Sequence, residues 1–555
     1  RIPADAALVA SGTQTGEVDG RLIYVPEMPE DQIPSLEMAM ASAPDQYRGA
    51  VALMWSHPRG ALFEALDRAG VSAVISFSSR ERYFDPDQVV YSRGSYSQGE
   101  NLRMGLTVSW RQWSELLEDA EGGKEITVRC KTKIGSYPDK YETVFCWIPG
   151  TEPDKKGVIF SAHLFEGYVK QGANDNKSGS ATILEVARTL NTLIEEGRIP
   201  RPRRTIRFLW GPEFSGTGPW VQEHKDLMEK TLANINMDMV GEWLSLNKAY
   251  MRLMRTTYGQ PHYINDVMEN YYRFVGESNN ERIQNRSGFY KVPRRIVAPS
   301  GADEPFYYSI ETHYGSSDHE VFNDWGVQVP GIMMIAWPDQ WYHTSGDRVD
   351  KADPTQLKRV AIIGAAAAYT VASADDDMAI RLAGEIASNA TRRLGHQFII
   401  GQELLNDATA ENLTEQYKWA RAHVEGTVMA EKETLASVME LGTDKARLGD
   451  YVDEMQGVVD AIGEAHLAAL ESHMRATATR LGTRPVELRT TDLERALDLL
   501  HDSNARLAEA REEAEAALTQ RGEQVAAEEH LLATREDRAQ QNRPGVLPAE
   551  FAQLP

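Results

Sequence analysis

The sequence predicts an α/β protein whose central part is an α/β/α sandwich, preceded by a β-rich domain and followed by an all-α helical region. From about residue 124 to residue 372, apolar strand-like runs alternate with amphipathic helical segments, a pattern typical of a mostly parallel sheet covered on both faces. Short strands and turns dominate before this part, and Ala, Glu, Leu and Arg dominate after it. We therefore expect domains over residues 1–122, 123–375 and 376–555.

Length and charge limit the classes of function. A chain of 555 residues is too long for one ordinary hydrophobic core. The formal net charge of −23, with no basic stripe to offset it, argues against nucleic acid as a partner and is interpreted mainly as a solubility feature. No run of eighteen or more apolar residues occurs, so no membrane span is predicted. The chain starts "RIPADAALVA", without Met or a charged-then-apolar leader, so we expect a processed product whose compartment this end does not reveal.

The first domain is expected to contain three strands and two helices. The runs "DGRLIYV", "GAVALMWS" and "GVSAVISFSS" have strand length, while "RGALFEALDRAG" has helical spacing and "VSWRQWSELLEDAEGG" is a helix ended by glycines. The two cysteines, Cys130 and Cys146, follow in strand-like runs joined by the turn-like "GSYPDKY". A hairpin there would place them nearly opposite each other, which leaves a disulfide and two buried thiols equally open.

The central domain is expected to alternate strands with helices. Strands are predicted at "GVIFSAHLF", "RTIRFLW", "TLANINMDMVG" and "VPGIMMIAWP", and helices at "NKSGSATILEVARTLNTLIEEG" and "GTGPWVQEHKDLME". Polar residues that follow such strands lie at the carboxyl edge of the sheet, where α/β proteins place their sites.

The C-terminal region is expected to be helical, with Leu and Ala recurring every three or four residues over 493–536. Two interpretations remain open. The helices form a bundle packed on the central domain, or they form an arm that makes a homo-oligomer.

Five residues carry candidate chemistry, and each follows an apolar strand or opens a helix: His163, Asp175, Glu213, Asp238 and His343. Imidazoles and carboxylates are ligands of Zn²⁺, and a catalytic zinc site keeps one position open for water. Each residue alone is a weak signal, since Asp175 could be a helix cap, but the ordered set is more specific than its members.

The ordered motifs "SAH…GANDNKSG…WGPE…NMDMVG…SDHEVF…YHTSGD" resemble the M28 family of zinc peptidases over residues 124 to 372. The resemblance implies two zinc ions bridged by Asp175. His163 and Asp238 would complete one site, His343 would serve the other, and Glu213 would be the general base. The first domain resembles a protease-associated domain, most clearly at "GVSAVIS" and "MGLTVSWRQWSELLE", which implies a secreted or cell-envelope setting.

Phe214 departs from this pattern, because the family usually has there a second Glu that completes the His343 site. Two ligands rarely hold zinc firmly. We therefore expect one strongly bound zinc ion slightly ahead of two, with Glu213 as general base and His343 stabilising an oxyanion. In a competing interpretation Glu213 binds the metal itself, and Glu166 or Glu320 could substitute in either role.

A second departure is Phe165, which stands where the family has an Asp that orients the histidine ligand. Loss of such a group typically costs about 10–100-fold in metal affinity or activity, although the neighbouring Glu166 could compensate. Asp318 and His319 are expected to support the site or the fold and not to bind metal.

The function expected from these residues is zinc-dependent peptide hydrolysis, most of all as an aminopeptidase, because an acidic pocket attracts a free α-amino group. A carboxypeptidase or a small amide hydrolase would use the same centre, and a degenerate centre would leave a peptide-binding scaffold. Cyclisation of N-terminal glutamine, which some relatives on the same fold perform, is not the favoured function, because those relatives keep ligands that this chain has lost. Five aromatic residues are candidates for the pocket lining, although packing is the favoured interpretation for any one of them: Tyr307, Tyr308, Trp337, Trp341 and Tyr342.

Overall fold

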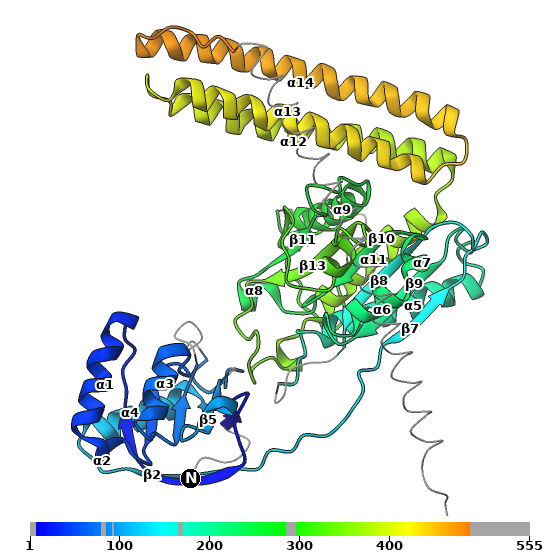
Figure 1. The fold of residues 1–555 in the computed structure, drawn as a ribbon. Helices are drawn as coiled ribbons and strands as arrows, with labels where there is room; N and C mark the ends of the chain where they lie inside the picture. Colours follow the sequence, from blue (N-terminus) through cyan, green and yellow to red (C-terminus); the bar gives the residue numbers. More distant parts are fainter. Residues whose placement is uncertain (1–6, 79–84, 92–93, 165–169, 285–295, 489–555) are drawn as a thin grey trace, which may run out of the picture. The chain divides into compact units, whose positions relative to one another are not determined.

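The computed structural model describes residues 7–78, 85–91, 94–164, 170–284 and 296–488 (Figure 1). The chain forms two compact units, one of Arg1–Gly401 with Ala420–Ala469 and one of Gln402–Trp419 with Leu470–Pro555. The helix expected over 493–536 lies outside the described residues, so the oligomeric arm stays a prediction.

The N-terminal sheet has six strands in the order β1-β5-β4-β3-β2-β6. Their bounds are Ala7–Val9, Gly16–Tyr24, Val51–Met54, Ala73–Ser76, Met104–Val108 and Thr127–Thr132 for β1 to β6. Strands β2 to β5 pair in parallel, and β1 and β6 add to the two edges in antiparallel fashion. The sheet continues past the expected domain boundary at residue 122, because β6 pairs with β2 along its whole length.

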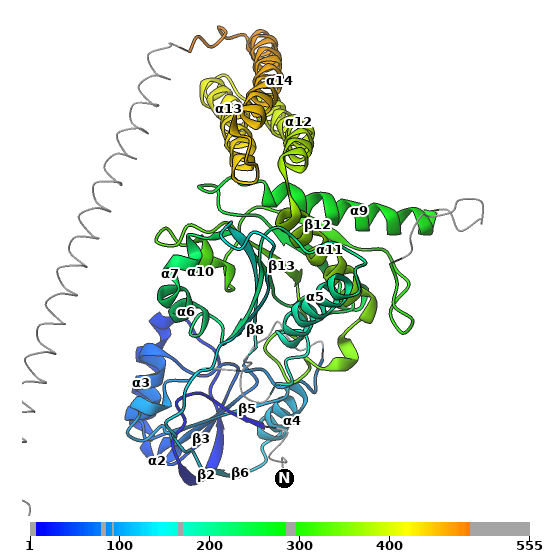
Figure 2. The same ribbon diagram turned by 90° about the vertical axis from the view of Figure 1, so that its right-hand side faces the viewer.

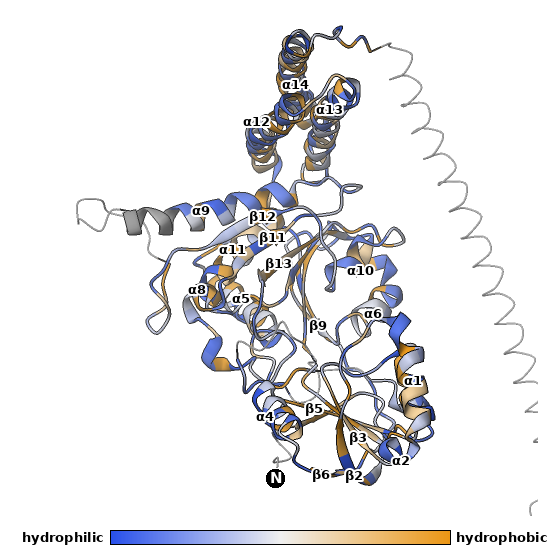
Figure 3. Ribbon diagram, turned by 90° about the vertical axis from the view of Figure 1, so that its left-hand side faces the viewer, coloured by the Kyte–Doolittle hydropathy of each residue, from blue (hydrophilic) through white to orange (hydrophobic). Residues whose placement is uncertain are grey.

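Helices cover both faces of this first sheet. Side chains of α1 (Ile33–Ser42) and α3 (Gly60–Arg68) pack against one face, and α4 (Trp110–Glu121) buries Trp113 against the other. The short α2 (Pro44–Tyr47) follows α1. Figure 3 shows the hydrophobic strands between these helices. The expected β-rich domain therefore has its sheet, and helices also contribute to its core.

The central sheet has seven strands in the order β12-β11-β13-β10-β8-β9-β7. Strands β8 (Gly157–His163), β9 (Ile206–Gly211), β10 (Thr231–Met237) and β13 (Gly331–Trp337) run parallel to one another. The outer strands β7 (Val144–Ile148), β11 (Tyr250–Met254) and β12 (Tyr308–Glu311) run in the opposite direction. The prediction of a mostly parallel sheet is confirmed.

Two helical layers enclose the central sheet (Figure 2). One layer contains α5 (Lys177–Glu195), α11 (Pro354–Ser373) and α9 (Ile264–Gln284). The other contains α6 (Thr217–Glu223), α7 (Lys225–Met228) and α10 (His319–Asn323), and it buries Trp220 and Phe322 against Ile159. The short α8 (Leu244–Asn247) lies between β10 and β11 in sequence. This arrangement is the expected α/β/α sandwich.

The two cysteines are free and belong to different sheets. Cys130 is buried in β6 of the first sheet, whereas Cys146 is exposed in β7 of the central sheet. The expected hairpin is wrong, because β6 pairs with β2 and β7 pairs with β9.

The C-terminal region contains the long helices α12 (Asp376–Asn406), α13 (Leu413–Ser437) and α14 (Lys445–Leu481). Within the first compact unit, Arg393 of α12 pairs at 2.9 Å with Asp266 of α9 and at 2.5 Å with Glu431 of α13. Buried charges of this kind are stable only when paired, so the network ties the start of the helical region to the sandwich. The expected boundary at residue 375 is therefore not a boundary between compact units. Across the described residues, no helix has the length and apolar character needed to cross a membrane.

The centre of the sheet offers a test of the packing. Phe160 is fully buried and stacks on Phe208 with ring centroids 5.2 Å apart. Replacing Phe160 by Ala removes a large side chain from a close-packed layer, which should destabilise the unit by about 3–5 kcal/mol in urea unfolding. The matched control is Phe274→Ala on α9, where the side chain is 54% exposed and we expect little change. Equal losses in both variants would contradict this account of the core.

Candidate metal centre

The five candidate residues converge on the carboxyl edge of the central sheet. His163 is the last residue of β8, Asp238 follows β10 directly, and Glu213 comes two residues after the end of β9. Asp175 precedes α5, and His343 lies in the loop after β13. The carboxyl ends of these four parallel strands share one edge, which is why residues far apart in the sequence meet there.

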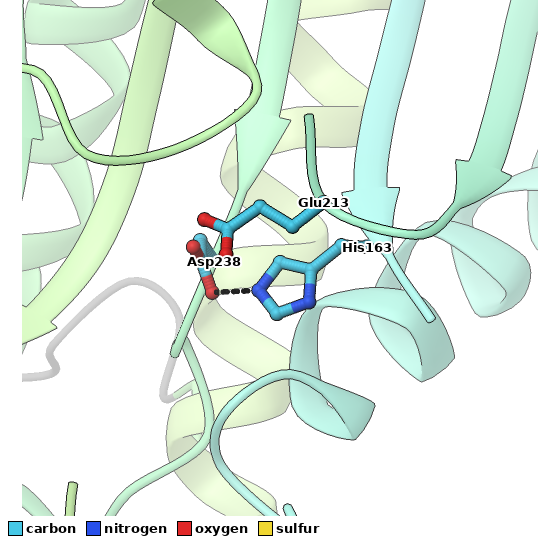
Figure 4. Close-up of side chains that lie close together, drawn as sticks. All are labelled: His163, Glu213 and Asp238. Atoms are coloured by element: carbon cyan, nitrogen blue, oxygen red, sulfur yellow. Dashed lines mark hydrogen bonds and ion pairs between the residues drawn. The ribbon is translucent and has the colours of Figure 1, made fainter. Parts of the chain in front are cut away.

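The core of the centre is formed by the buried His163 and Asp238 and the half-buried Glu213 (Figure 4). Each offers one ligand atom, and these atoms lie within 4.8 Å of one another. His163 Nε2 lies 3.2 Å from Asp238 Oδ1 and 3.4 Å from Asp175 Oδ1. Ligand bonds of 2.0–2.1 Å in a tetrahedral zinc site place neighbouring ligand atoms about 3.3 Å apart, so these spacings suit one cation.

Asp175 uses its second oxygen for different partners. Its Oδ2 lies 3.2 Å from His343 Nε2 and 2.5 Å from Lys170 Nζ. Burial alone would raise the pKa of Asp175, but hydrogen bonds from His163 and His343 and the charge of Lys170 hold that pKa well below its usual range. The Asp175 carboxylate is therefore ionised, and its two oxygens are shared among His163, His343 and Lys170. Sequence analysis missed Lys170, whose signal is only a lysine five residues before Asp175.

Asp347 fixes the backbone that carries Asp175. Its two carboxylate oxygens accept hydrogen bonds from the backbone N–H groups of Asn174 at 2.7 Å and of Asp175 at 3.0 Å. Burial raises the pKa of Asp347 to about 6. The residue ends the "YHTSGD" motif, and sequence analysis gave it no role.

Asn176 fixes the same loop from the other side. Its side-chain oxygen accepts hydrogen bonds from the N–H groups of Gly179 and Met239, and its amide donates to the Met237 carbonyl at 2.9 Å. A Cβ at Gly179 would lie 2.0 Å from the Met237 carbonyl oxygen, so only glycine permits this approach of α5 to β10. The loop of Asp175 is thus locked beside Asp238.

The loop that carries Glu213 is held by Asp318. Phe214 adopts a left-handed backbone, with φ of 51°, and its N–H donates to Asp318 Oδ1 at 2.8 Å. A bulky residue rarely adopts this conformation, and the buried carboxylate supports it. Asp318 thus supports the site as predicted.

The other residues considered near Glu213 do not join the cluster. His319 is buried, and its Nε2 lies 2.8 Å from the Tyr314 carbonyl oxygen, in keeping with a structural role. Glu320 is exposed and accepts a hydrogen bond from the Ser316 N–H, so it does not replace the missing ligand. Phe165 and Glu166 lie outside the described residues.

The surroundings of Glu213 raise its pKa. Burial raises its pKa to about 8, and the negative charges of Asp238, Asp318 and Asp175 act in the same direction, while His163 opposes them. Perturbed carboxyl groups in a cavity are typical of functional sites.

The loop of His343 is also held by a segment of the N-terminal domain. The Tyr91 N–H donates to the His343 carbonyl oxygen at 2.8 Å, and Val89 and Ser345 exchange two hydrogen bonds of 2.9 Å. His343 has a left-handed backbone with φ of 56°, so this support fixes an unusual conformation. Nothing in the sequence indicated this contact, which joins segments about 250 residues apart.

The centre opens into a cavity of about 560 Å³. Of the five aromatic candidates, Trp337 and Tyr342 line this cavity, whereas Tyr307, Tyr308 and Trp341 are not among its lining residues. Trp341 instead is buried and donates its indole N–H to Asp85. Two charged residues, Arg252 and Glu311, also line the cavity.

The donor set fits a zinc ion on the His163 side. Ligand atoms of His163, Asp238 and Glu213 lie within 4.8 Å of one another, and Asp175 Oδ1 lies 3.4 Å from His163 Nε2. His163, Asp238 and Asp175 are buried. Within the described ranges of the chain, the His343 side offers two donor groups, His343 and Asp175, and it holds the Lys170 ammonium. That side does not fit a second zinc ion.

A buried imidazole–carboxylate cluster at the edge of an α/β/α sandwich, open to a cavity, defines a candidate metal-dependent hydrolase domain. Residues 143–368 match Peptidase family M28, so the chain carries a peptidase domain of this family.

Curated relatives share this domain with the chain. Aminopeptidase YwaD of Bacillus subtilis (strain 168) is 28% identical over 224 residues, which is 38% of this chain and 40% of the relative. Glutamate carboxypeptidase 2 homolog of Caenorhabditis briggsae is 25% identical over 227 residues, which is 40% of this chain and 27% of the relative. The matches thus span less than half the length of either relative.

A solved structure, the aminopeptidase from Aneurinibacillus sp. strain AM-1, is also similar to this chain. It is 19% identical, with 66% of this chain and 77% of that chain covered, at a TM-score of 0.35.

The raised pKa of Glu213 predicts a pH-dependent stability of the zinc-free protein. The stabilisation of the folded state by protonated Glu213 is complete below the ordinary pKa of 4.5 and is lost as the pH rises through about 8. Between these two values the carboxyl group ionises in the unfolded chain but stays protonated in the folded chain. Glu213→Gln cannot ionise. Its melting temperature in chelator should therefore exceed that of the wild-type protein by at least about 2 °C near pH 9, with the gap closing toward about pH 5.

The matched control for this measurement is Glu223→Gln on α6, where the side chain is exposed. Its melting temperature should follow the wild-type value at every pH. A difference between Glu213→Gln and the wild-type protein that stays constant with pH would show that Glu213 ionises normally in the fold.

Proposed function

We propose that this chain hydrolyses peptide bonds next to a free N-terminus, with one zinc ion held by His163, Asp175 and Asp238 and with Glu213 as general base. The observation that carries this proposal is the cluster of His163, Glu213 and Asp238, of which Glu213 and Asp238 line the cavity. Zinc, when bound, supplies a Lewis acid that lowers the pKa of water and polarises a carbonyl group.

Glu213 is placed to move protons. It lines the cavity and lies within 4.8 Å of the ligand atoms of His163 and Asp238. A carboxylate there takes a proton from the attacking water and passes it to the leaving amine. Its raised pKa means that the group exchanges a proton readily near neutral pH.

His343 supplies an imidazole at the same cavity. Its side chain is 41% exposed, and the neighbouring Tyr342 ring stacks on it with centroids 3.7 Å apart. An N–H donor fixed in this way stabilises negative charge that develops on the carbonyl oxygen of the substrate.

The charge of the cavity supports the preference for an N-terminus. Four acidic side chains line it, namely Asp175, Glu213, Asp238 and Glu311. A free α-amino group is attracted to such a lining, because opposite charges interact strongly where water is partly excluded. The aminopeptidases among the similar proteins agree with this preference.

Arg252 favours a second candidate function. Its side chain lines the cavity from β11, where it also donates a hydrogen bond to the Trp337 carbonyl oxygen at 3.2 Å. A guanidinium group binds a carboxylate in a bidentate manner, which would suit a carboxypeptidase. One similar protein is named a glutamate carboxypeptidase 2 homolog. If the chain cleaves no substrate, it is a peptide-binding scaffold without catalytic activity.

The general-base role is tested by Glu213→Gln. The variant should keep about one zinc ion per chain and lose hydrolysis of aminoacyl anilides by about 10²–10⁴-fold, because the amide cannot accept a proton. Zinc is measured by elemental analysis on dialysed protein, with Glu223→Gln as the matched control. Loss of zinc together with activity would instead make Glu213 a metal ligand, and unchanged activity would exclude it as the base.

The preference for one end of the substrate is tested by two cavity variants. Glu311→Gln should raise the KM for substrates with a free amino group by about tenfold, whereas Arg252→Met should leave that KM nearly unchanged. The measurement compares aminoacyl anilides with N-blocked dipeptides that carry a free carboxylate. Cleavage of the blocked dipeptides that depends on Arg252 would support the carboxypeptidase instead.

A further inference from the structure

The carboxylate of Asp175 separates two sides of the centre. Oδ1 lies 3.4 Å from His163 Nε2, and Oδ2 lies 3.2 Å from His343 Nε2. Both spacings are those of two ligands of one ion, since ligand bonds of 2.0–2.1 Å separate neighbouring ligands by about 3.3 Å. The geometry alone therefore offers one cation position on each side of Asp175.

The two sides differ in their further donors. The His163 side gains carboxylates from Asp238 and Glu213. The resemblance in sequence assigns the next ligand of the His343 side to position 214, where this chain has Phe214. Phe214 has no donor atom in its side chain, which is 40% exposed.

A cation is nevertheless present on the His343 side. Lys170 Nζ lies 2.5 Å from Asp175 Oδ2 and donates to the Asp175 carbonyl oxygen at 3.1 Å. The lysine side chain is only 6% exposed, so its charge is removed from water and is stable there only beside a carboxylate.

We propose that the ammonium group of Lys170 takes the place of a second metal ion beside Asp175. This inference rests on the zinc site of the proposed function. When Asp175, Asp238 and Glu213 are ionised they carry three negative charges, and one divalent ion together with one ammonium carries three positive charges. A second divalent ion would have to enter against the charge of Lys170, at a position where Phe214 offers no ligand.

The experiment counts zinc in dialysed protein for the wild type and four variants. The wild type and Lys170→Met should each bind about one zinc ion, because the residues that the structure describes offer no third ligand on the His343 side of either protein. Phe214→Glu should also bind about one, because the ammonium still holds the position. The double variant Lys170→Met with Phe214→Glu should bind about two. Lys225→Met, which alters an exposed lysine on α7, is the matched control and should bind about one.

A second readout is the visible absorption of cobalt-substituted protein, which should saturate at about one equivalent in the wild type and about two in the double variant. Two zinc ions in the wild type would overturn the proposal, and this outcome does not depend on how any variant folds. A double variant that has the wild-type circular dichroism but holds one ion would overturn it as well. One zinc ion without peptide hydrolysis would overturn the proposed function alone. Two ions with hydrolysis would overturn the role of Lys170 and the one-zinc centre but not the proposed peptidase activity.

Discussion

The centre depends on one buried, ionised carboxylate that several positive or polar groups share. Asp175 contacts His163 through one oxygen and His343 and Lys170 through the other. Such a charge is tolerable in a buried position only when its partners are fixed. The fixation comes from the backbone, because Asp347 holds the N–H groups of Asn174 and Asp175. The geometry of both sides of the centre follows from the position of this one side chain.

The support of the centre extends beyond the sandwich. The ends of β8 and β10 place His163 and Asp238 rigidly, because these strands pair directly in the middle of the sheet. His343 lies on a loop, and a loop is less constrained than a strand. Its backbone is held by residues 89–91 of the N-terminal domain. The N-terminal domain thus holds the loop of His343, which the sheet does not fix.

The sequence was sufficient for the sandwich and for the candidate residues, because strand-length apolar runs and the polar residues that follow them are local signals. It was insufficient where pairing between distant segments decides the outcome. The run around Cys130 looks like half of a hairpin, yet β6 pairs with β2, more than a hundred residues earlier. Lys170 and Asp347 gave no local signal either, since a lysine or an aspartate in a loop is ordinarily a solvated residue. The roles that the resemblance assigns to Glu213 and His343, and the protease-associated character of the first domain, stay predictions.

Phe214, which departs from the family pattern, and the buried Lys170 side chain are physically linked. A glutamate at position 214 and a buried lysine at position 170 would each change the charge beside Asp175, in opposite directions. With Phe214 in place, one negative charge is missing, and a second divalent cation would leave the site with excess positive charge. The Lys170 ammonium carries half the charge of a divalent ion. Because the ammonium is covalently bound to the chain through the lysine side chain, it can neutralise Asp175 without a third ligand. On this argument Phe214 does not leave a damaged two-metal centre but belongs to a centre whose charge balances with one metal ion.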